Sequence, residues 1–374
     1  MARREDTPAL RILQRVNLPL ALWTVALVAY GTLMVSSATS GMAGGAGMFR
    51  RHLIGILIGL IPLVLFWALD YKVLQHWTGP LGALMLVLLT AVLLPGFGVM
   101  VNGQRNWLGI GSLRLFQPSE PAKLLLIVIL ATVIARYKGK IEKPSEVAHI
   151  LAYLAVPLAL IMLEPDLGTV LVFVVITAGM LLVGGLKPRW FAVFALVAVI
   201  LVAGVWQTGI LKTYQKDRLA VFIDPSVDPK GAGYNLAQSK IAIGSGGLTG
   251  KGLGSGTQSS LNFIPERHTD FIFAVLGEEL GFLGAIVLLG LYLALLITAL
   301  EISASSRDLY GALIAAGLIS MWLFQVLVNM GMTIGIMPVT GIPLPFMSFG
   351  GSFMVTNLAG VGMLLSVWSR RYGT

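Results

Sequence analysis

Apolar stretches of about 20 residues recur along nearly the whole chain, and they limit its possible folds more than any other feature. A helix needs about this length to cross a hydrocarbon core of about 30 Å, and inside a bilayer the protein itself must satisfy every backbone polar group. Only 11% of the 374 residues are charged, against roughly 25% in ordinary soluble domains. The sequence therefore predicts an all-α polytopic membrane protein without a separate soluble domain.

About ten transmembrane helices are expected. Their approximate ranges are 17–38, 52–69, 76–95, 118–137, 147–163, 167–185, 189–209, 270–299, 308–330 and 349–368. The arginine-rich N-terminus resembles a signal peptide, but its apolar run is too long for one, so we expect an uncleaved first helix.

The placement of Lys and Arg in the short loops predicts the orientation of these helices. With a cytoplasmic N-terminus, the short outer loops carry only Arg50, Arg51, Arg105 and Arg114, and the other short-loop basic residues fall inside. Both termini are therefore expected in the cytoplasm. The whole chain, 1–374, is interpreted as one transmembrane domain with a cytoplasmic tail at 1–16 and a large extracytoplasmic loop at 210–269, between the seventh and eighth helices.

That loop is roughly 60 residues long, and loops of this length in compact proteins are usually functional or disordered. Aromatic and aliphatic residues are mixed with its glycines and charges. We therefore expect an ordered loop on the outer membrane face, with a short interfacial helix from Ala237 to Ile243.

Composition excludes several kinds of chemistry. The chain has no cysteine, which rules out disulfides, thiolate nucleophiles and cysteine-bound zinc. Its four histidines show no paired metal-binding spacing. The net charge of +9 comes from basic residues scattered over loops, without the patch expected of a nucleic-acid-binding protein.

Several polar groups are expected at the outer face. Glu120 and Lys123 are three residues apart at the start of the fourth span, where Ser119 is available as a cap. The pair either closes the helix end or belongs to a functional site, since ionisable groups at membrane depth are costly. Arg105, beside Trp107, either binds phosphate or extends to lipid headgroups.

Three further segments could contribute to a site, and the first two of them each allow two interpretations. Asp166 follows Glu164 in a turn between two spans, and it either caps the sixth helix or serves the site. The glycine-rich run 244–252, flanked by Lys240 and Lys251, is either an anion-binding nest or a flexible hinge. The segment 338–352 is too rich in Pro and Gly for a regular helix, so we expect it to form one wall of a site.

The charged segment Pro265–Asp270 directly precedes the eighth span. Either Thr269 or Asp270 could cap that helix, and a helix N-terminus would make the Asp270 carboxylate a weaker base. The alternative is that Asp270 is a catalytic base at the outer membrane face. Glu278 and Glu279 lie farther along the same span, and we expect Glu279 to be buried and paired.

Taken in order, these motifs resemble the SEDS family (shape, elongation, division and sporulation) over nearly the whole chain. The matching segments are Gln117–Lys123, Pro165–Thr169, Asp224–Tyr234, Gln238–Gly247, Gly256–Gln258, Pro265–Phe273 and Pro338–Ser352. The motifs are more similar to those of elongation-type than division-type members. Glu164 departs from the family pattern, which often has Gln there.

The resemblance implies a peptidoglycan glycosyltransferase that polymerises lipid II at the outer face of the bacterial cytoplasmic membrane, with inversion at the sugar. Asp270 would then deprotonate the 4-hydroxyl of the acceptor, and undecaprenyl pyrophosphate would leave. The expected substrate-binding residues are Arg105, Trp107, Glu120, Lys123, Asp166, Lys216, Arg218, Gln258, Glu266, His268, Thr269 and Ser348.

The implied partners are lipid II, the nascent glycan strand, membrane lipids and a class B penicillin-binding protein, and no nucleic acid. No cofactor is required by the residues, although a divalent cation, Mg²⁺ or Mn²⁺, could assist. Three alternatives stay open at this point: a lipid II flippase, a division-type polymerase and a scaffold that only positions a partner.

Overall fold

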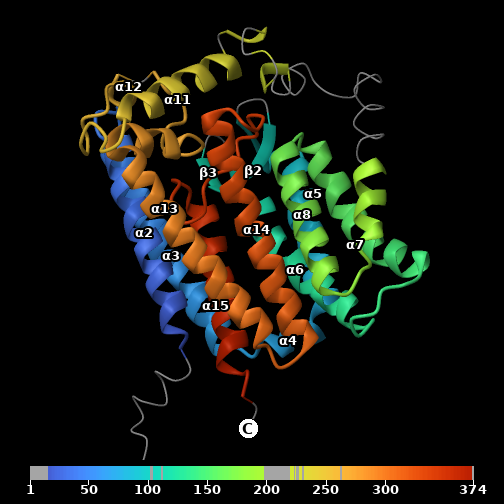
Figure 1. Cartoon of the computed structure of the whole chain (residues 1–374). Helices are drawn as coiled ribbons and strands as arrows, with labels where there is room; N and C mark the ends of the chain where they lie inside the picture. Colours follow the sequence, from blue (N-terminus) through green and yellow to red (C-terminus); the bar gives the residue numbers. More distant parts are fainter. Residues whose placement is uncertain are drawn as a thin grey trace, which may run out of the picture.

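The computed structural model describes residues 16–101, 104–110, 113–197, 220–222, 224, 227–229, 231–261 and 263–372. Within them the chain is a bundle of long helices (Figure 1). The helices are α2 (Leu18–Thr39), α3 (Gly45–Ala68), α4 (Tyr71–His76), α5 (Thr78–Leu93), α6 (Ser119–Ala135), α7 (Pro144–Leu163), α8 (Leu167–Val183), α11 (Ala232–Gly246), α12 (Thr257–Ser260), α13 (Ile272–Ala304), α14 (Leu309–Ile334) and α15 (Gly351–Ser369).

Nine of the expected spans coincide with one of these helices to within a few residues, except that α3 begins earlier, at Gly45. The remaining span, 189–209, begins as helix at 189–197, and its later part lies outside the described residues. Among the described helices, α2, α3, α7, α13, α14 and α15 are long and apolar enough to cross a bilayer. The chain is a multi-pass membrane protein; the count of ten spans stays a prediction.

The helices differ in how many of their residues are buried. Within an apolar stretch of 18 residues in each helix, the buried share is 72% for α14 and 78% for α15, against 17% for α3. Residues of α6 from Ser119 to Ile134 are also almost all buried. The centre of the bundle is therefore formed by α6, α14 and α15, and the indole of Trp322 joins two of them by donating to Asn357 Oδ1 at 2.8 Å.

Figure 1 shows that α11, α12 and a small sheet lie at one end of the bundle, whereas α4 and the C-terminus lie at the other. α11 crosses this first end and packs against α13 and α14. The expected helix at 237–243 is thus present, as part of the longer α11, and its position at the membrane interface stays a prediction.

The sheet consists of β1 (Gly98–Val101), β2 (Gln104–Ile110) and β3 (Leu113–Phe116) in antiparallel order β1-β2-β3. It directly precedes α6 and was not predicted from the sequence. Its strands are only four to seven residues long, too short to stand out against the apolar spans on either side.

The segment between α14 and α15 is irregular, as expected from its proline and glycine content. It is nevertheless buried: Leu344, Phe346, Met347 and Ser348 have no exposed surface. Gly31 of α2 approaches the backbone of Phe346 and Met347 so closely that a Cβ there would overlap it. The irregular backbone is thus enclosed by protein, as membrane depth requires.

Candidate functional site

The turn that carries Asp270 is closed by one backbone carbonyl. Glu266 has a positive φ of 50°, and its carbonyl oxygen accepts hydrogen bonds from the N–H groups of Thr269, Asp270 and Phe271 at 3.1, 3.1 and 3.3 Å. α13 then begins at Ile272, with Phe271 at the N-cap position and no side-chain cap. The interpretation of Thr269 or Asp270 as the N-cap is therefore wrong, because after the Glu266 turn the N-cap position falls one or two residues later, at Phe271.

Three consecutive carbonyl groups, those of residues 268 to 270, are tethered to the rest of the bundle. The Phe349 N–H donates to the carbonyl of His268 at 2.9 Å, and Ser348 Oγ donates to that of Thr269 at 2.6 Å. Asn329 Nδ2 of α14 donates to the carbonyl of Asp270 at 2.9 Å. The Asp270 backbone is thus fixed before any substrate arrives, as a catalytic group requires.

Asp166 belongs to the same region through the irregular segment. Its carboxylate accepts hydrogen bonds from the N–H and Oγ1 of Thr169 at 3.0 and 2.8 Å, so it caps α8 as expected. A Cβ on Gly168 would lie 3.0 Å from the side chain of Ile342. Asn329 Nδ2 also donates to the Ile342 carbonyl, at 2.8 Å. One irregular segment therefore brings the starts of α8 and α13 together.

Glu120 and Lys123 form the predicted pair, with 2.8 Å between Oε1 and Nζ and side chains only 5% and 3% exposed. The Lys123 ammonium lies 5.4 Å from the ring centroid of Phe353, just after the irregular segment. Glu120 Oε2 has no hydrogen-bond partner among the described residues. Ser119 is the first helical residue after the N-cap Pro118, so the expected Ser119 cap is wrong.

Arg105 and Trp107 both lie on β2, and an irregularity in the register between them interrupts the alternation of side chains, since Trp107 pairs with Val99 and Arg105 with the next residue of β1. Arg105 pairs in register with Met100, and its stem lies 2.7 Å from where a Gly98 Cβ would be. The sheet places both residues at the same end of the bundle as α11 (Figure 1). Lys216 and Arg218, two further expected ligands, lie outside the described residues.

The remaining expected ligands divide between two places. His268, Thr269 and Ser348 belong to the tethered turn, and the exposed Glu266 accepts from Thr269 Oγ1 at 3.2 Å. Burial lowers the pKa of His268, which favours the neutral imidazole although Glu266 opposes the shift. Gln258 instead contacts Glu278, to whose Oε1 its N–H donates at 2.8 Å.

Three residues of this region are not among the expected site residues. Asn329 could have been found as a polar side chain within an apolar span. Arg267, part of the charged segment before α13, is fully buried, and its Nε donates to the Ala38 carbonyl at 2.7 Å. Glu164 is fully buried, and neither carboxylate oxygen has a hydrogen-bond partner among the described residues. Burial, with a contribution from Asp166, raises the pKa of Glu164 to about 8.

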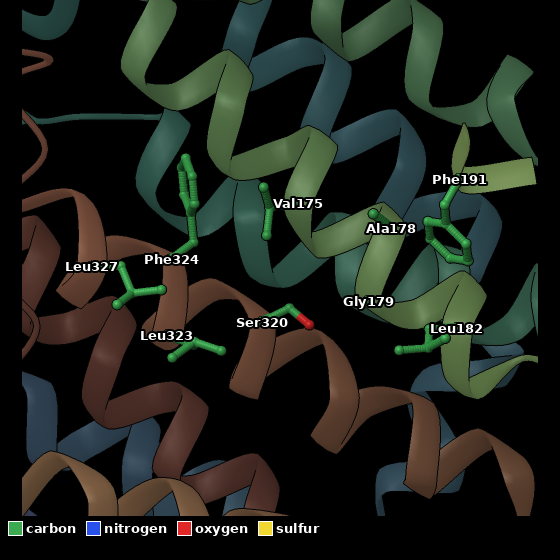
Figure 2. A pocket seen from close by; sticks show the side chains of 9 residues that line it. All are labelled: Val175, Ala178, Gly179, Leu182, Phe191, Ser320, Leu323, Phe324 and Leu327. Carbon is green, nitrogen blue, oxygen red and sulfur yellow. The ribbon is translucent and has the colours of Figure 1, made fainter. Parts of the chain in front are cut away.

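An apolar groove of about 280 Å³ lies between α8 and α14 and is closed on one side by Phe191 (Figure 2). Ser320 is its one polar side chain, and its hydroxyl donates to the Ala316 carbonyl of its own helix at 2.8 Å. Ser320 and Asn329 are nine residues apart, or about 14 Å along the helix. The groove is therefore distinct from the polar region around Asp270 and offers no titratable group.

Fold and site together define a multi-pass membrane protein with a tethered carboxylate-bearing turn at one end of its helix bundle. The FtsW, RodA and SpoVE family, described as cell cycle proteins, matches residues 18–372. The chain belongs to this family.

The similarity to individual proteins extends over nearly the full length. The peptidoglycan glycosyltransferase MrdB of Escherichia coli K12 is 39% identical over 348 residues, which cover 93% of this chain and 92% of MrdB. A chain of a peptidoglycan synthase complex that coordinates polymerization and crosslinking matches with a TM-score of 0.81 and 33% identity, over 96% of this chain and 99% of that one. The rod shape determining protein RodA of Thermus thermophilus matches with a TM-score of 0.72 and 31% identity, over 96% and 98%.

Proposed function

We propose that this chain is a peptidoglycan glycosyltransferase that polymerises lipid II at the outer face of the bacterial cytoplasmic membrane during elongation, with Asp270 as the catalytic base. The glycosyltransferase activity agrees with the names of its relatives. The proposed role of Asp270 is supported mainly by the tethered backbone of its turn. The backbone on both sides of the carboxylate is fixed, and the helix that follows begins without a side-chain cap.

In the proposed reaction Asp270 accepts the proton of the 4-hydroxyl of the acceptor GlcNAc. The oxygen attacks the anomeric carbon of the donor MurNAc, a new glycosidic bond forms, and the bond from that carbon to the pyrophosphate breaks with inversion. Undecaprenyl pyrophosphate carries away the bonding electrons. Fixing the base in advance lowers the barrier, because its ordering is complete before the substrate binds.

The leaving pyrophosphate needs positive charge nearby. Arg105 and Lys123 are at the correct end of the bundle, and Lys123 would have to be shared between Glu120 and the phosphate. No group of three or more potential metal-ligating side chains occurs among the described residues. Mg²⁺ and Mn²⁺ assistance stays a prediction, since such an ion can be held by one or two carboxylates together with the substrate pyrophosphate.

The placement in the membrane follows from the distribution of charge. The end of the bundle with α11 and the sheet is proposed to be extracytoplasmic, since the basic short loops favour the opposite end for the cytoplasm. A class B penicillin-binding protein is the proposed partner, which is supported by the similarity to a chain of a peptidoglycan synthase complex.

The decisive experiment compares Asp270→Asn with Asp70→Asn in a lipid II polymerisation assay with the partner present. Asn keeps the shape of Asp at both positions. Asp70 lies beyond α3, and its side chain accepts the Lys72 N–H at 2.9 Å, a bond that Asn retains. Asp270→Asn should abolish glycan chains and Asp70→Asn should not.

Normal chain formation by Asp270→Asn would reject the proposed base. Transfer of lipid II across liposome membranes without polymerisation, and without sensitivity to Asp270, would instead indicate a flippase. Full tolerance of changes at Asp270 with the partner still bound would indicate a scaffold.

A further inference from the structure

α13 is broken about two and a half turns after its start, at Gly281. Gly281 has φ 63° and ψ −159°, which is not helical, so Ile272–Leu280 forms a short helix separated from the longer remainder of α13. We call these nine residues the Asp270 helix. A break of this kind releases backbone N–H and carbonyl groups that need other partners.

The glycine-rich run provides those partners. The N–H groups of Lys251 and Gly252 donate to the carbonyls of Glu278 and Glu279 at 3.0 and 2.9 Å. On the other side of the break, the N–H groups of Phe282 and Leu283 donate to the carbonyls of Gly247 and Leu248 at 2.9 and 3.0 Å. Four backbone hydrogen bonds thus join the run to both sides of Gly281, so the run is docked and the expected flexible hinge is wrong.

Glycines are required where these backbones meet. A Cβ on Gly246 would overlap the carbonyl oxygen of Gly277, and one on Gly250 would overlap that of Glu279. Gly244, in the same helix as Gly246, has no atom within 4 Å of such a Cβ. The close approach therefore depends on particular glycines and not on the run as a whole.

Side chains hold the Asp270 helix from two directions. Glu278 is fully buried, and its Oε1 accepts from Lys251 Nζ at 2.8 Å, Thr257 Oγ1 at 3.1 Å and the Gln258 N–H at 2.8 Å. On the other side, Ser37 Oγ of α2 donates to the Glu279 carboxylate at 2.6 Å. Lys251, considered above for binding an anion, is therefore paired with Glu278.

We propose that Glu278, together with the close contacts of Gly246 and Gly250, positions Asp270 for catalysis. The Asp270 helix is held by α11 and residues 247–258, and the break at Gly281 separates it from the membrane-spanning remainder of α13. Loosening these contacts would move the base relative to the acceptor hydroxyl while leaving the substrate ligands on α6 in place. This inference rests on the proposed role of Asp270.

The first test compares Gly246→Ala with Gly244→Ala in the full chain with its partner. The folded fraction is isolated by size exclusion, and rates are expressed per folded molecule. We expect Gly246→Ala to lower kcat about 100-fold, the size of loss that a displacement of about 1 Å causes, with KM for lipid II unchanged within about twofold. Gly244→Ala should behave as wild type.

Equal kcat values for the two folded glycine variants would overturn the inference. So would a loss confined to KM, which would indicate a role in binding. Normal activity of the Asp270→Asn variant would instead reject the proposed base itself, so the two failures are distinguishable.

If Gly246→Ala does not fold, the Glu278 variants test whether Glu278 positions Asp270. Glu278→Gln keeps an oxygen that can accept from Thr257 and Gln258, so it should retain kcat within about threefold, whereas Glu278→Ala should lose about tenfold or more at unchanged KM. Equal kcat for Glu278→Ala and wild type would reject the positioning role. A loss in Glu278→Gln as large as that in Glu278→Ala would reject hydrogen bonding as its basis.

Discussion

Asp166 and Asp270 occupy similar places in the sequence, each near the start of an apolar helix at the same end of the bundle, yet the structure uses them differently. The Asp166 carboxylate accepts two hydrogen bonds from Thr169 and caps α8. At α13 the helix begins two residues after Asp270, and the turn before it is closed by the Glu266 carbonyl.

The difference separates a carboxylate that caps its own helix from one whose turn is fixed through the backbone. A capping carboxylate already accepts hydrogen bonds from its own helix, which stabilises its charge and weakens it as a base. The backbone of Asp270 is held by Glu266 and Asn329, and its side chain does not cap α13. The comparison predicts that substitutions at the two positions affect different measurements.

The largest expected effect is on the rate at Asp270. Asp270→Ala and Asp270→Asn should each reduce polymerisation by about 1,000-fold or more, as loss of a general base does. Their thermal unfolding temperatures in detergent should match each other, because the α13 N-cap position is Phe271. If Ala proved clearly less stable than Asn, Asp270 would contribute to capping after all, and the contrast with Asp166 would fail.

The next effect concerns the buried pair of Glu120 and Lys123. Lys123→Met leaves an unpaired buried carboxylate and should lower the unfolding free energy by about 3 kcal/mol. Adding Glu120→Gln should restore most of that stability. The double variant should still be inactive if the pair also binds substrate, so unfolding and polymerisation measured on both variants separate the two roles. Recovery of both activity and stability in the double variant would show that the pair has only a structural role.

Glu164, two residues before Asp166, provides a prediction about pH. Its pKa in the folded state is raised from 4.5 to about 8, chiefly by burial. Between these two pH values the folded protein keeps a proton on Glu164 that the unfolded chain releases. The protonated side chain therefore contributes to the free energy of unfolding in full below pH 4.5, and this contribution is lost as pH rises towards 8. The free energy of unfolding of Glu164→Gln, relative to that of wild type, should therefore rise by about 1 kcal/mol per pH unit between pH 5 and 7. A difference independent of pH would show that Glu164 is ionised when folded.

The helices were predictable from sequence because membrane spans produce long apolar runs, and α8 and α14 begin and end close to the expected residues. The sheet was missed, although Asn102-Gly103 between β1 and β2 is a common hairpin sequence that could have indicated it. The expected cap at Asp270 was wrong because the positive φ of Glu266 is not visible in the sequence.

The contacts around Gly281 show a different kind of limit. A glycine within an apolar run is tolerated in helices and gives no sign of a break. The partners at 247–252 are about 30 residues away along the chain and share no periodic pattern with α13. Asp270 itself was identifiable because a charged segment precedes an apolar span, whereas the groups that fix it, such as Asn329, depend on tertiary contacts.

The smallest expected effect is at Asp166. Asp166→Ala removes the acceptor for the Thr169 N–H and should lower the unfolding free energy by about 1 kcal/mol, the usual value for an N-cap. Asp166→Asn should lose less, because the Asn side-chain oxygen can still accept that hydrogen bond. Thermal unfolding in detergent and polymerisation rates per folded molecule measure both effects. If Asp166→Asn remained stable but lost activity, the carboxylate would serve the site in addition to capping α8, and the division between the two aspartates would be one of degree.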